Sequence, residues 1–407
     1  MVRALEDRTS MPLDWWRYLV AQTVSLIGGQ IWLVAATWEA AERSGPGGVA
    51  LVLSAALAPQ ALLLVLGGTL VDRGDLRRLM LAADILRAGL MVIVALAVIQ
   101  WATSLIPLVL AGIALGTVDA LYLPASAAAI SRLVPQALAP RAAGLAAAAT
   151  RTAVAVGAPL GGIAVATGGL AAAALLNAVS YVAVAAAIRA STLREATSTP
   201  AIVATSLRCD LVTGLRYVTS NPLLRSIVAA TMAFNATLAA VINIGLPSLV
   251  EERHWGTGVS GLLLMFYGIG ATVSGAILMK KPLPRWAGKA IIVLMLFISL
   301  IYPTVGAAPS RQFAAVAVSL IGLAGTTASA LLMALIQANL QDSLRGRAFS
   351  LIRLATVAAV PLTYFLFGSV ASSGGVAVAV ALAALFQLAA GALLLRVTAL
   401  RNATLPL

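Results

Sequence analysis

The sequence is poor in charge and in reactive side chains. Only 10% of its 407 residues are charged, whereas 61% are hydrophobic, and a soluble domain carries roughly a quarter charged residues. Its single cysteine, Cys209, excludes an internal disulfide and a thiolate metal cluster. The single histidine, His254, lies in no Ser-His setting, and no nucleotide-binding Gly-Lys-Ser or Gly-Lys-Thr is present. We therefore expect no enzyme, no metal and no cofactor.

What the sequence does contain is a series of apolar runs, each about 20 residues long, the length that crosses a bilayer. They lie near 16–38, 47–71, 79–101, 105–130, 142–166, 170–189, 224–248, 258–279, 288–306, 313–338, 350–372 and 376–395. The predicted fold class is an all-α integral membrane protein of twelve transmembrane helices. The predicted domains are an N-terminal six-helix half (1–190), a cytoplasmic linker (191–222) and a C-terminal six-helix half with a short cytoplasmic tail (223–407).

Basic residues define the expected orientation. The net charge is +13, and most of the 27 lysines and arginines fall in alternate loops, so those loops are predicted to be cytoplasmic. Both termini then lie on the cytoplasmic side of a cell membrane. Basic loops that face anionic lipid explain the net charge, and no nucleic-acid partner is expected.

Several motifs suggest a family. Gly68-x-Leu70-x-Asp72-Arg73 is followed by Arg77-Arg78, and Asp84-x-x-Arg87 follows just inside span three. This arrangement resembles the major facilitator superfamily, and within it the subgroup of the enterobactin exporter and related secretion-type efflux proteins. The resemblance implies two six-helix bundles related by a pseudo-twofold axis, and transport by alternating access. Asp75, which stands where the superfamily usually has Gly, is part of the resemblance to this subgroup. One departure stands out: Gly29 replaces an acidic residue that many relatives carry.

Four charged residues fall inside the predicted spans, where each needs a partner or an aqueous cavity: Asp84, Arg87, Asp119 and Arg151. Asp119 and Arg151 lie roughly 17 Å and roughly 14 Å from their cytoplasmic span ends, so they are predicted to pair. This pair either couples protons at Asp119 or is a permanent ion pair that orients two helices. Asp84 and Arg87 share one helical face and are interpreted as bracing span three against the charged loop.

Uncharged polar residues in the spans are candidates for a substrate cavity. They are Gln22, Ser25, Gln30, Tyr181, Asn235, Asn243, Tyr267, Gln337 and Tyr364. Such residues also form hydrogen bonds between helices, so packing is an alternative role for each of them. Because the group is weakly polar, it favours an amphipathic or moderately hydrophobic compound.

The loop after span two is predicted to be a conformational latch formed by Gly68, Asp72, Arg73, Arg77 and Arg78. Asp72 can accept hydrogen bonds from a helix N-terminus, and the resemblance places that helix near residues 351–353. The alternative is a lipid-facing cluster of topogenic charges.

The predicted function is a secondary active exporter of a small amphipathic compound (a natural product, a siderophore or a drug), coupled to protons by antiport. We expect a monomer embedded in lipid. The alternatives are a lysophospholipid flippase on the same fold and a non-transporting membrane receptor or scaffold.

Overall fold

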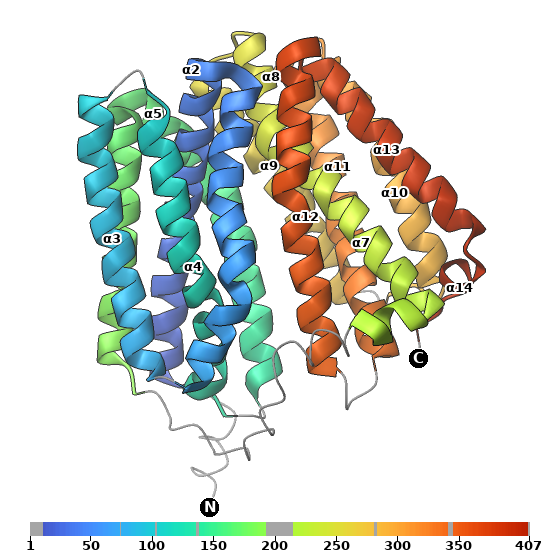
Figure 1. Cartoon of the computed structure of the whole chain (residues 1–407), viewed down its shortest axis with the longest axis horizontal. Coiled ribbons are helices and arrows are strands. Elements are labelled where there is room, and N and C mark those ends of the chain that lie inside the picture. Colours follow the sequence, from blue (N-terminus) through green and yellow to red (C-terminus); the bar gives the residue numbers. More distant parts are fainter. Residues whose placement is uncertain are drawn as a thin grey trace, which may run out of the picture. The chain divides into compact units, whose positions relative to one another are not determined.

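The computed structural model describes residues 11–73, 75–101, 104–135, 138–192, 215–280, 283–340 and 345–405. All regular structure in these residues is helical, which confirms the predicted class (Figure 1). The elements are α2 (Leu13–Arg73), α3 (Leu76–Gln100), α4 (Ile106–Leu133), α5 (Ala139–Ala190), α7 (Pro222–Ala240), the π-helix η2 (Val241–Gly245), α8 (Leu246–Glu252), α9 (Thr257–Lys280), α10 (Ala287–Gly306), α11 (Arg311–Asn339), α12 (Arg345–Gly374), α13 (Val376–Arg396) and α14 (Thr398–Arg401).

The described part of the chain contains 10 helices that are long and apolar enough to cross a membrane. Two of them are twice the length of a bilayer and break in the middle: α2 breaks at Ser44 and Gly45, and α5 breaks at Gly169. Gly45 and Gly169 have φ of 60° and 65°, a left-handed conformation that glycine adopts at no steric cost. Each long helix therefore crosses twice, and the twelve predicted spans are all present.

The chain divides into two compact units. Unit 1 comprises Met1–Ala36 and Ala55–Pro200, and unit 2 comprises Thr37–Ser54 and Ala201–Leu407. The turn between the first two spans thus groups with the second unit. Within unit 2, Ser54 Oγ donates to the backbone oxygen of Pro361 at 3.2 Å, and Gly368 leaves no room for a Cβ beside Ala50.

Unit 1 is built around close helix contacts that small residues allow. The core of unit 1 includes Trp15, Tyr18, Met80 and Tyr122, all of them buried. On α5, Gly157 and Gly161 face the first span of α2, where a Cβ on Gly161 would lie 2.9 Å from Val34 Cβ and 3.1 Å from Ile31 O. This face of α5 is therefore a helix-packing surface, because side chains larger than hydrogen at Gly157 and Gly161 would push the two helices apart.

This contact predicts opposite effects for two glycines on one helix. Gly161→Ala is expected to lower the free energy of unfolding by about 1–3 kcal/mol, because it overpacks the α2 contact. Gly144→Ala is the matched control, since a Cβ there meets no atom within 4 Å, and it is expected to be neutral or stabilising by about 0.5–1 kcal/mol. Denaturant titration of the purified protein in detergent measures both. Equal responses would show that Gly161 is not a packing residue.

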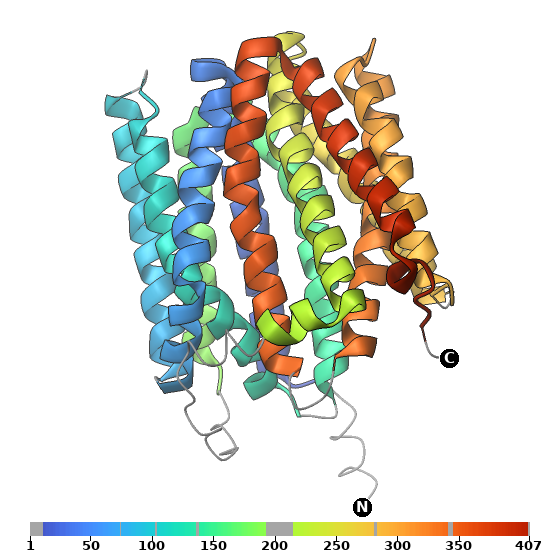
Figure 2. The ribbon, with the colours of Figure 1, turned by 45° about the vertical axis from the view of Figure 1, so that its right-hand side comes forward.

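Unit 2 pairs α9 with α11, α10 with α13, and α7 with α12. Figure 2 shows the yellow-green α7 beside the red-orange α12 from a second direction. Its interior holds a fully buried Gln387. Thr237 Oγ1 donates to Gln387 Oε1, and Gln387 Nε2 donates to the backbone oxygen of Met295 at 3.1 Å. The buried amide therefore ties together α7, α10 and α13 by hydrogen bonds that are neutral.

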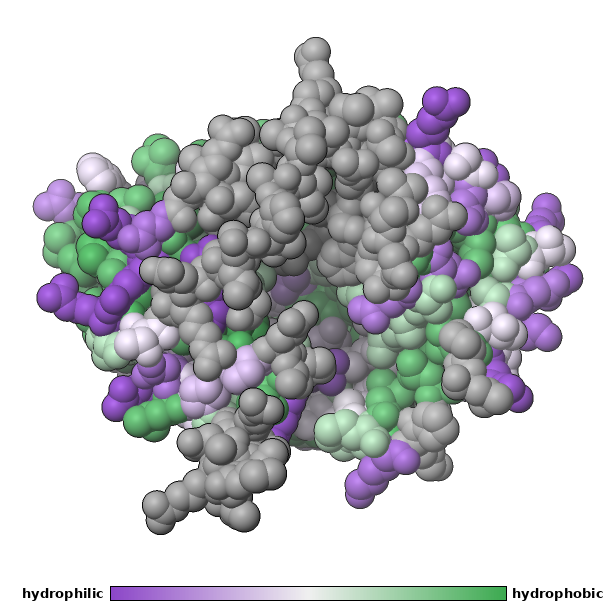
Figure 3. Space-filling view, turned by 90° about the horizontal axis from the view of Figure 1, so that it is seen from below, coloured by the Kyte–Doolittle hydropathy of each residue, from purple (hydrophilic) through white to green (hydrophobic). Residues whose placement is uncertain are grey.

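Charged side chains are exposed at helix ends, among them Arg78, Arg189 and Arg401. Figure 3 views the molecule from below, and hydrophilic side chains appear on this face with hydrophobic ones between them. Basic residues at the ends of apolar helices lie where lipid head groups meet water.

Candidate functional site

Arg87 lies at the centre of a charged cluster inside unit 1. Its Nη2 donates to Asp84 Oδ1 one turn earlier on α3, and its Nη1 donates to Asp119 Oδ1 on α4 at 3.0 Å. Asp84 is 0% exposed and Arg87 is 5% exposed. The predicted pairing of Asp119 with Arg151 is therefore wrong: Arg151 is half-buried and forms no ion pair with any residue that the structure describes.

The reason for this correction is geometric. Counting residues along a helix gives the depth of a side chain but not the neighbour it faces. Helix α3 packs closely on α4, whereas α4 and α5 barely touch. Asp119 therefore faces Arg87 of α3. Asp84 and Arg87 form the predicted charged pair, and both side chains lie in the core, where Arg87 also bonds across to α4. Their interpretation as a brace against the charged loop stays a prediction, because the side chains of Asp72 and Arg73 lie outside the described part.

Two tyrosines enclose the guanidinium group. The Cζ atom of Arg87 lies 3.5 Å from the ring centroid of Tyr122 on α4 and 4.5 Å from that of Tyr181 on α5. Stacking of a guanidinium on aromatic faces is favourable, and more so away from water. Asn177 Nδ2 donates to the hydroxyl of Tyr181 at 3.4 Å. The cluster thus joins α3, α4 and α5 around one fixed cation.

Tyr122 also connects the cluster to α2, because its hydroxyl donates to Gln22 Oε1 at 2.9 Å. Sequence reasoning did not select Tyr122. A signal was present, because Asp119 and Tyr122 stand three residues apart and so share one face of α4. Gln22, predicted as a cavity residue, is thus bonded to a tyrosine that covers the cation.

Tyr122 allows its two contacts to be separated experimentally. Tyr122→Phe keeps the ring over Arg87 and removes the bond to Gln22, so a loss of about 1 kcal/mol in unfolding free energy is expected. Tyr122→Leu removes both contacts, and a further loss of about 0.5–2 kcal/mol is expected. Chemical unfolding in detergent provides the measurement. If the two variants were equally stable, stacking on Arg87 would contribute nothing.

The cluster contains two carboxylates and one guanidinium, so it reaches electrical neutrality when one carboxyl group carries a proton. The two carboxylates differ in accessibility. Asp84 is enclosed, whereas the side chain of Asp119 is 34% exposed. Asp119 is therefore the more accessible of the two carboxyl groups in the cluster.

Of the predicted latch residues, Gly68, Asp72 and Arg73 lie outside the part whose side chains the structure describes. The described loop residues make bonds within unit 1. Asp75 caps the N-terminus of α3 by accepting from the backbone N–H groups of Arg77 and Arg78 at 3.0 and 3.3 Å. The Arg77 side chain donates to the backbone oxygen of Arg189 at the end of α5. An N-cap explains why Asp replaces the usual Gly at this position.

Unit 2 contains a cavity of about 290 Å³ between α7, α11 and α12. It is lined by Thr231, Asn235, Ser329, Leu332, Met333, Ile336, Ile352, Thr356 and Val357. Asn235 was predicted as a cavity residue, and the structure places it in this wall. None of the described lining residues is charged.

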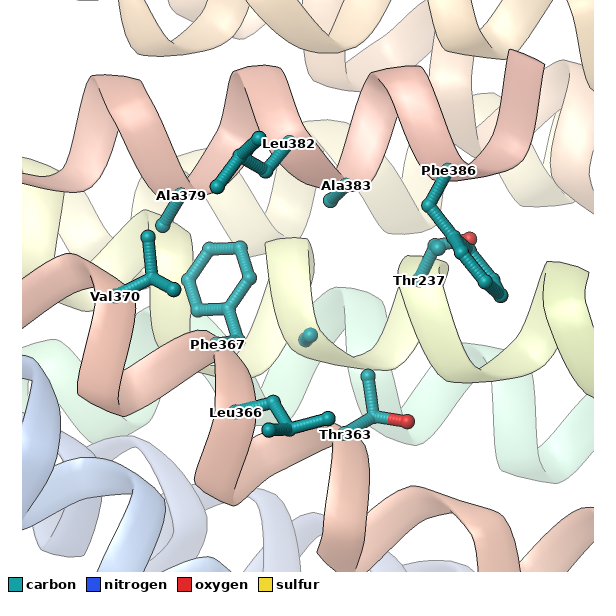
Figure 4. A pocket seen from close by; sticks show the side chains of 10 residues that line it. Thr237, Thr363, Leu366, Phe367, Val370, Ala379, Leu382, Ala383 and Phe386 are labelled. Carbon is teal, nitrogen blue, oxygen red and sulfur yellow. The ribbon is translucent and has the colours of Figure 1, made fainter. Parts of the chain in front are cut away.

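A second cavity in unit 2, of about 200 Å³, lies between α7, α12 and α13. Figure 4 shows Phe367, Val370 and Ala379 pointing into it from two helices. The Thr363 hydroxyl donates to the backbone oxygen of Ala359 at 3.0 Å. Leu366, Leu382 and Phe386 at its edge are 56%, 48% and 58% exposed. This cavity is an apolar crevice, and sequence reasoning did not predict it.

The remaining predicted cavity residues are dispersed. Asn243, in the π-helix η2, donates from Nδ2 to the hydroxyl of Tyr364 at 2.8 Å, which fits the packing alternative. Ser25 is buried, Tyr267 is half-buried and Gln337 is exposed. Gln30 is half-buried on the face of α2 that packs against Gly157.

Gly29 is the position for which the family resemblance implies an acidic residue in many relatives. A Cβ at Gly29 would meet no described atom within 4 Å. The neighbouring Gly28, by contrast, packs against Ser180 and Asn177. The structure thus leaves space for a side chain at Gly29, and the chain has none there.

Residues 14–404 match the model of a family described as transmembrane secretion effector, MFS_3. No curated protein matches the sequence. Among solved structures, the fold is similar to a bacterial homologue of the human lysosomal transporter Spinster in an inward-facing, occupied conformation (TM-score 0.71, 15% identity, covering 95% of each chain). It is also similar to the nucleoside transporter NupG (0.73, 11% identity, 95% of this chain and 99% of that one), and to the xylose transporter XylE from E. coli, inward open (0.71, 12%, 94% and 95%).

Proposed function

We propose that this protein is a secondary active exporter that exchanges protons for a small amphipathic compound. The chain belongs to the transmembrane secretion effector family, so it is a multi-pass membrane transporter of the major facilitator superfamily and not an enzyme. The observation that carries this proposal is the cluster of Asp84, Arg87 and Asp119. It combines a permanent cation, an enclosed carboxylate and a carboxylate that solvent can reach.

Charge balance supports proton coupling at this cluster. When Asp119 is ionised, the cluster carries one excess negative charge, and a charge inside a membrane protein is expensive. Protonation of Asp119 removes that charge and weakens its bond to Arg87, because the attraction between two opposite charges is replaced by that between a cation and a neutral carboxyl group. Proton uptake would thus loosen the contact between α3 and α4. This is the step that we propose drives the change between inward and outward states.

The remaining parts of the proposal concern placement. We propose that the protein is a monomer in the cytoplasmic membrane. We place both termini in the cytoplasm because most lysines and arginines fall in the alternate loops on that side of the membrane. The segment from Gly68 to Arg78, where α2 ends and α3 begins, would be the latch, with Arg77 anchoring it to the end of α5.

A lipid flippase is the second candidate, and the crevice between α12 and α13 favours it. Its edge is exposed and apolar at Leu366, Leu382 and Phe386, so the acyl chain of a lysophospholipid could enter from the bilayer.

Proteoliposomes containing the purified protein separate these candidates. A panel of amphipathic compounds is tested for efflux with and without a pH gradient, while an internal dye records proton movement. Antiport predicts compound-dependent proton movement and accumulation that follows the gradient. Movement of a fluorescent lysophospholipid without proton movement would favour the flippase instead, and no flux of either kind would refute both.

A further inference from the structure

We propose that the cavity between α7, α11 and α12 of unit 2 binds the hydrogen-bond-donating part of an uncharged ligand, namely a hydroxyl or N–H group on an otherwise apolar molecule. The proposal rests on the proposed transport function and specifies the substrate class. Its evidence is the set of hydrogen bonds that the polar residues lining this cavity, which we call its wall, already form within the protein.

The amide of Asn235 has a defined orientation. Its Nδ2 donates to the backbone oxygen of Thr231 at 2.8 Å. A backbone oxygen can only accept, so the nitrogen must be the atom at this contact and Oδ1 must point the other way. None of the described residues donates to Oδ1. Asn235 therefore presents an acceptor that has no partner among the described residues.

The threonine hydroxyls of the wall are also limited to accepting. Thr231 Oγ1 donates to the backbone oxygen of Ile227 at 2.7 Å, and Thr356 Oγ1 donates to that of Ile352 at 2.8 Å. Each hydroxyl has one hydrogen, and here that hydrogen is donated to a backbone oxygen of the same helix. The two hydroxyl oxygens can therefore offer a ligand in the cavity only lone pairs, which accept hydrogen bonds. The exposed Ser329 adds one hydroxyl that can donate or accept.

This wall selects among ligand classes. A charged group would lose its hydration and find no countercharge among the described lining residues. A hydrocarbon would leave the acceptors without partners, which is unfavourable. An uncharged donor avoids both penalties, and Leu332, Met333 and Ile336 pack against its apolar part. The volume of about 290 Å³ lies at the small end of ligand pockets, at about 300 Å³, so it holds a ring-sized portion of a ligand.

The test uses two probes that differ by one hydroxyl group, para-hexylphenol and hexylbenzene. In a Cys209→Ser background, Ser329→Cys introduces one thiol into the wall, and its reaction with N-ethylmaleimide is followed in detergent. We expect para-hexylphenol to protect the thiol at a concentration about tenfold lower than hexylbenzene, the effect of one hydrogen bond. Adding Asn235→Leu, which is similar in size, should remove the difference. Adding Thr363→Val, in the second cavity, should leave it intact.

Thr356→Val serves as the second variant if Asn235→Leu does not fold, and it should narrow the difference between the probes. The proposal is overturned if neither probe protects, if both protect equally in the parent, or if the difference survives loss of the wall acceptors. The measurement needs no proton gradient. Absence of antiport with selective protection would therefore refute the proposed function alone, whereas antiport with equal protection would refute only this binding site.

Discussion

Asp119→Asn is expected to abolish compound-dependent proton movement in proteoliposomes while the protein still folds. An amide side chain does not gain or lose a proton, so the one accessible titrating group of the cluster is lost. The side chain keeps its size, and its oxygen can still accept from Arg87 Nη1, which lies 3.0 Å from Asp119 Oδ1 in the native chain. The fold should therefore survive, with a loss no greater than the difference between a charged and a neutral hydrogen bond, about 1 kcal/mol.

The expected signature is a separation of two activities. The Asp119→Asn protein should still exchange labelled compound down its concentration gradient, yet a pH gradient should no longer drive accumulation. The compound is the one that the panel identifies, and proton movement is read from the internal dye.

Arg151→Leu is the matched control. It removes the other intramembrane arginine, which forms no ion pair among the described residues, and it should leave coupling unchanged. Coupling that survives Asp119→Asn would exclude Asp119 as the proton site. Coupling that disappears with Arg151→Leu would show that Arg151 takes part, as the pair of Asp119 and Arg151 suggested from the sequence requires.

The fold could be predicted because its signals are local. Apolar runs of bilayer length define each span, and even the breaks at Gly45 and Gly169 coincide with the ends of the predicted runs. The four intramembrane charges were also identified from the sequence. The pairing of Asp84 with Arg87 on one helix was also predicted and is observed. The observed partner of Asp119 was not predicted, because rotation of α4 about its axis and its distance from α5 depend on packing by residues such as Gly116, where a Cβ would collide with the backbone of Ala56.

The cavities were the least predictable feature. Asn235 and Tyr364 belong to the same class of uncharged intramembrane polar residues, yet Asn235 lines a cavity while Tyr364 is 3% exposed and bonded to Asn243. What separates them is whether a neighbouring helix supplies a partner. That property belongs to two helices together, and no pattern within one helix contains it.

Arg87→Met is expected to have the largest effect on stability. It leaves the carboxylate of Asp84, which is 0% exposed, without its cation, and Asp84 Oδ2 already has no hydrogen-bond partner among the described residues. Removing one partner of a buried pair lowers the free energy of unfolding by about 3–5 kcal/mol. Low yield and a large drop in the unfolding midpoint, measured in detergent, are the expected results.

A double variant distinguishes loss of the ion pair from loss of the arginine itself. Asp84→Leu with Arg87→Met removes both enclosed charges and leaves Asp119, which is partly exposed and can be hydrated. Because replacing a buried pair by apolar residues is often neutral or stabilising, this protein should recover most of the stability lost in Arg87→Met. It should still fail to couple protons, because protonation of Asp119 then breaks no bond to a cation. Recovery of coupling together with stability would show that Arg87 holds the fold and has no part in transport.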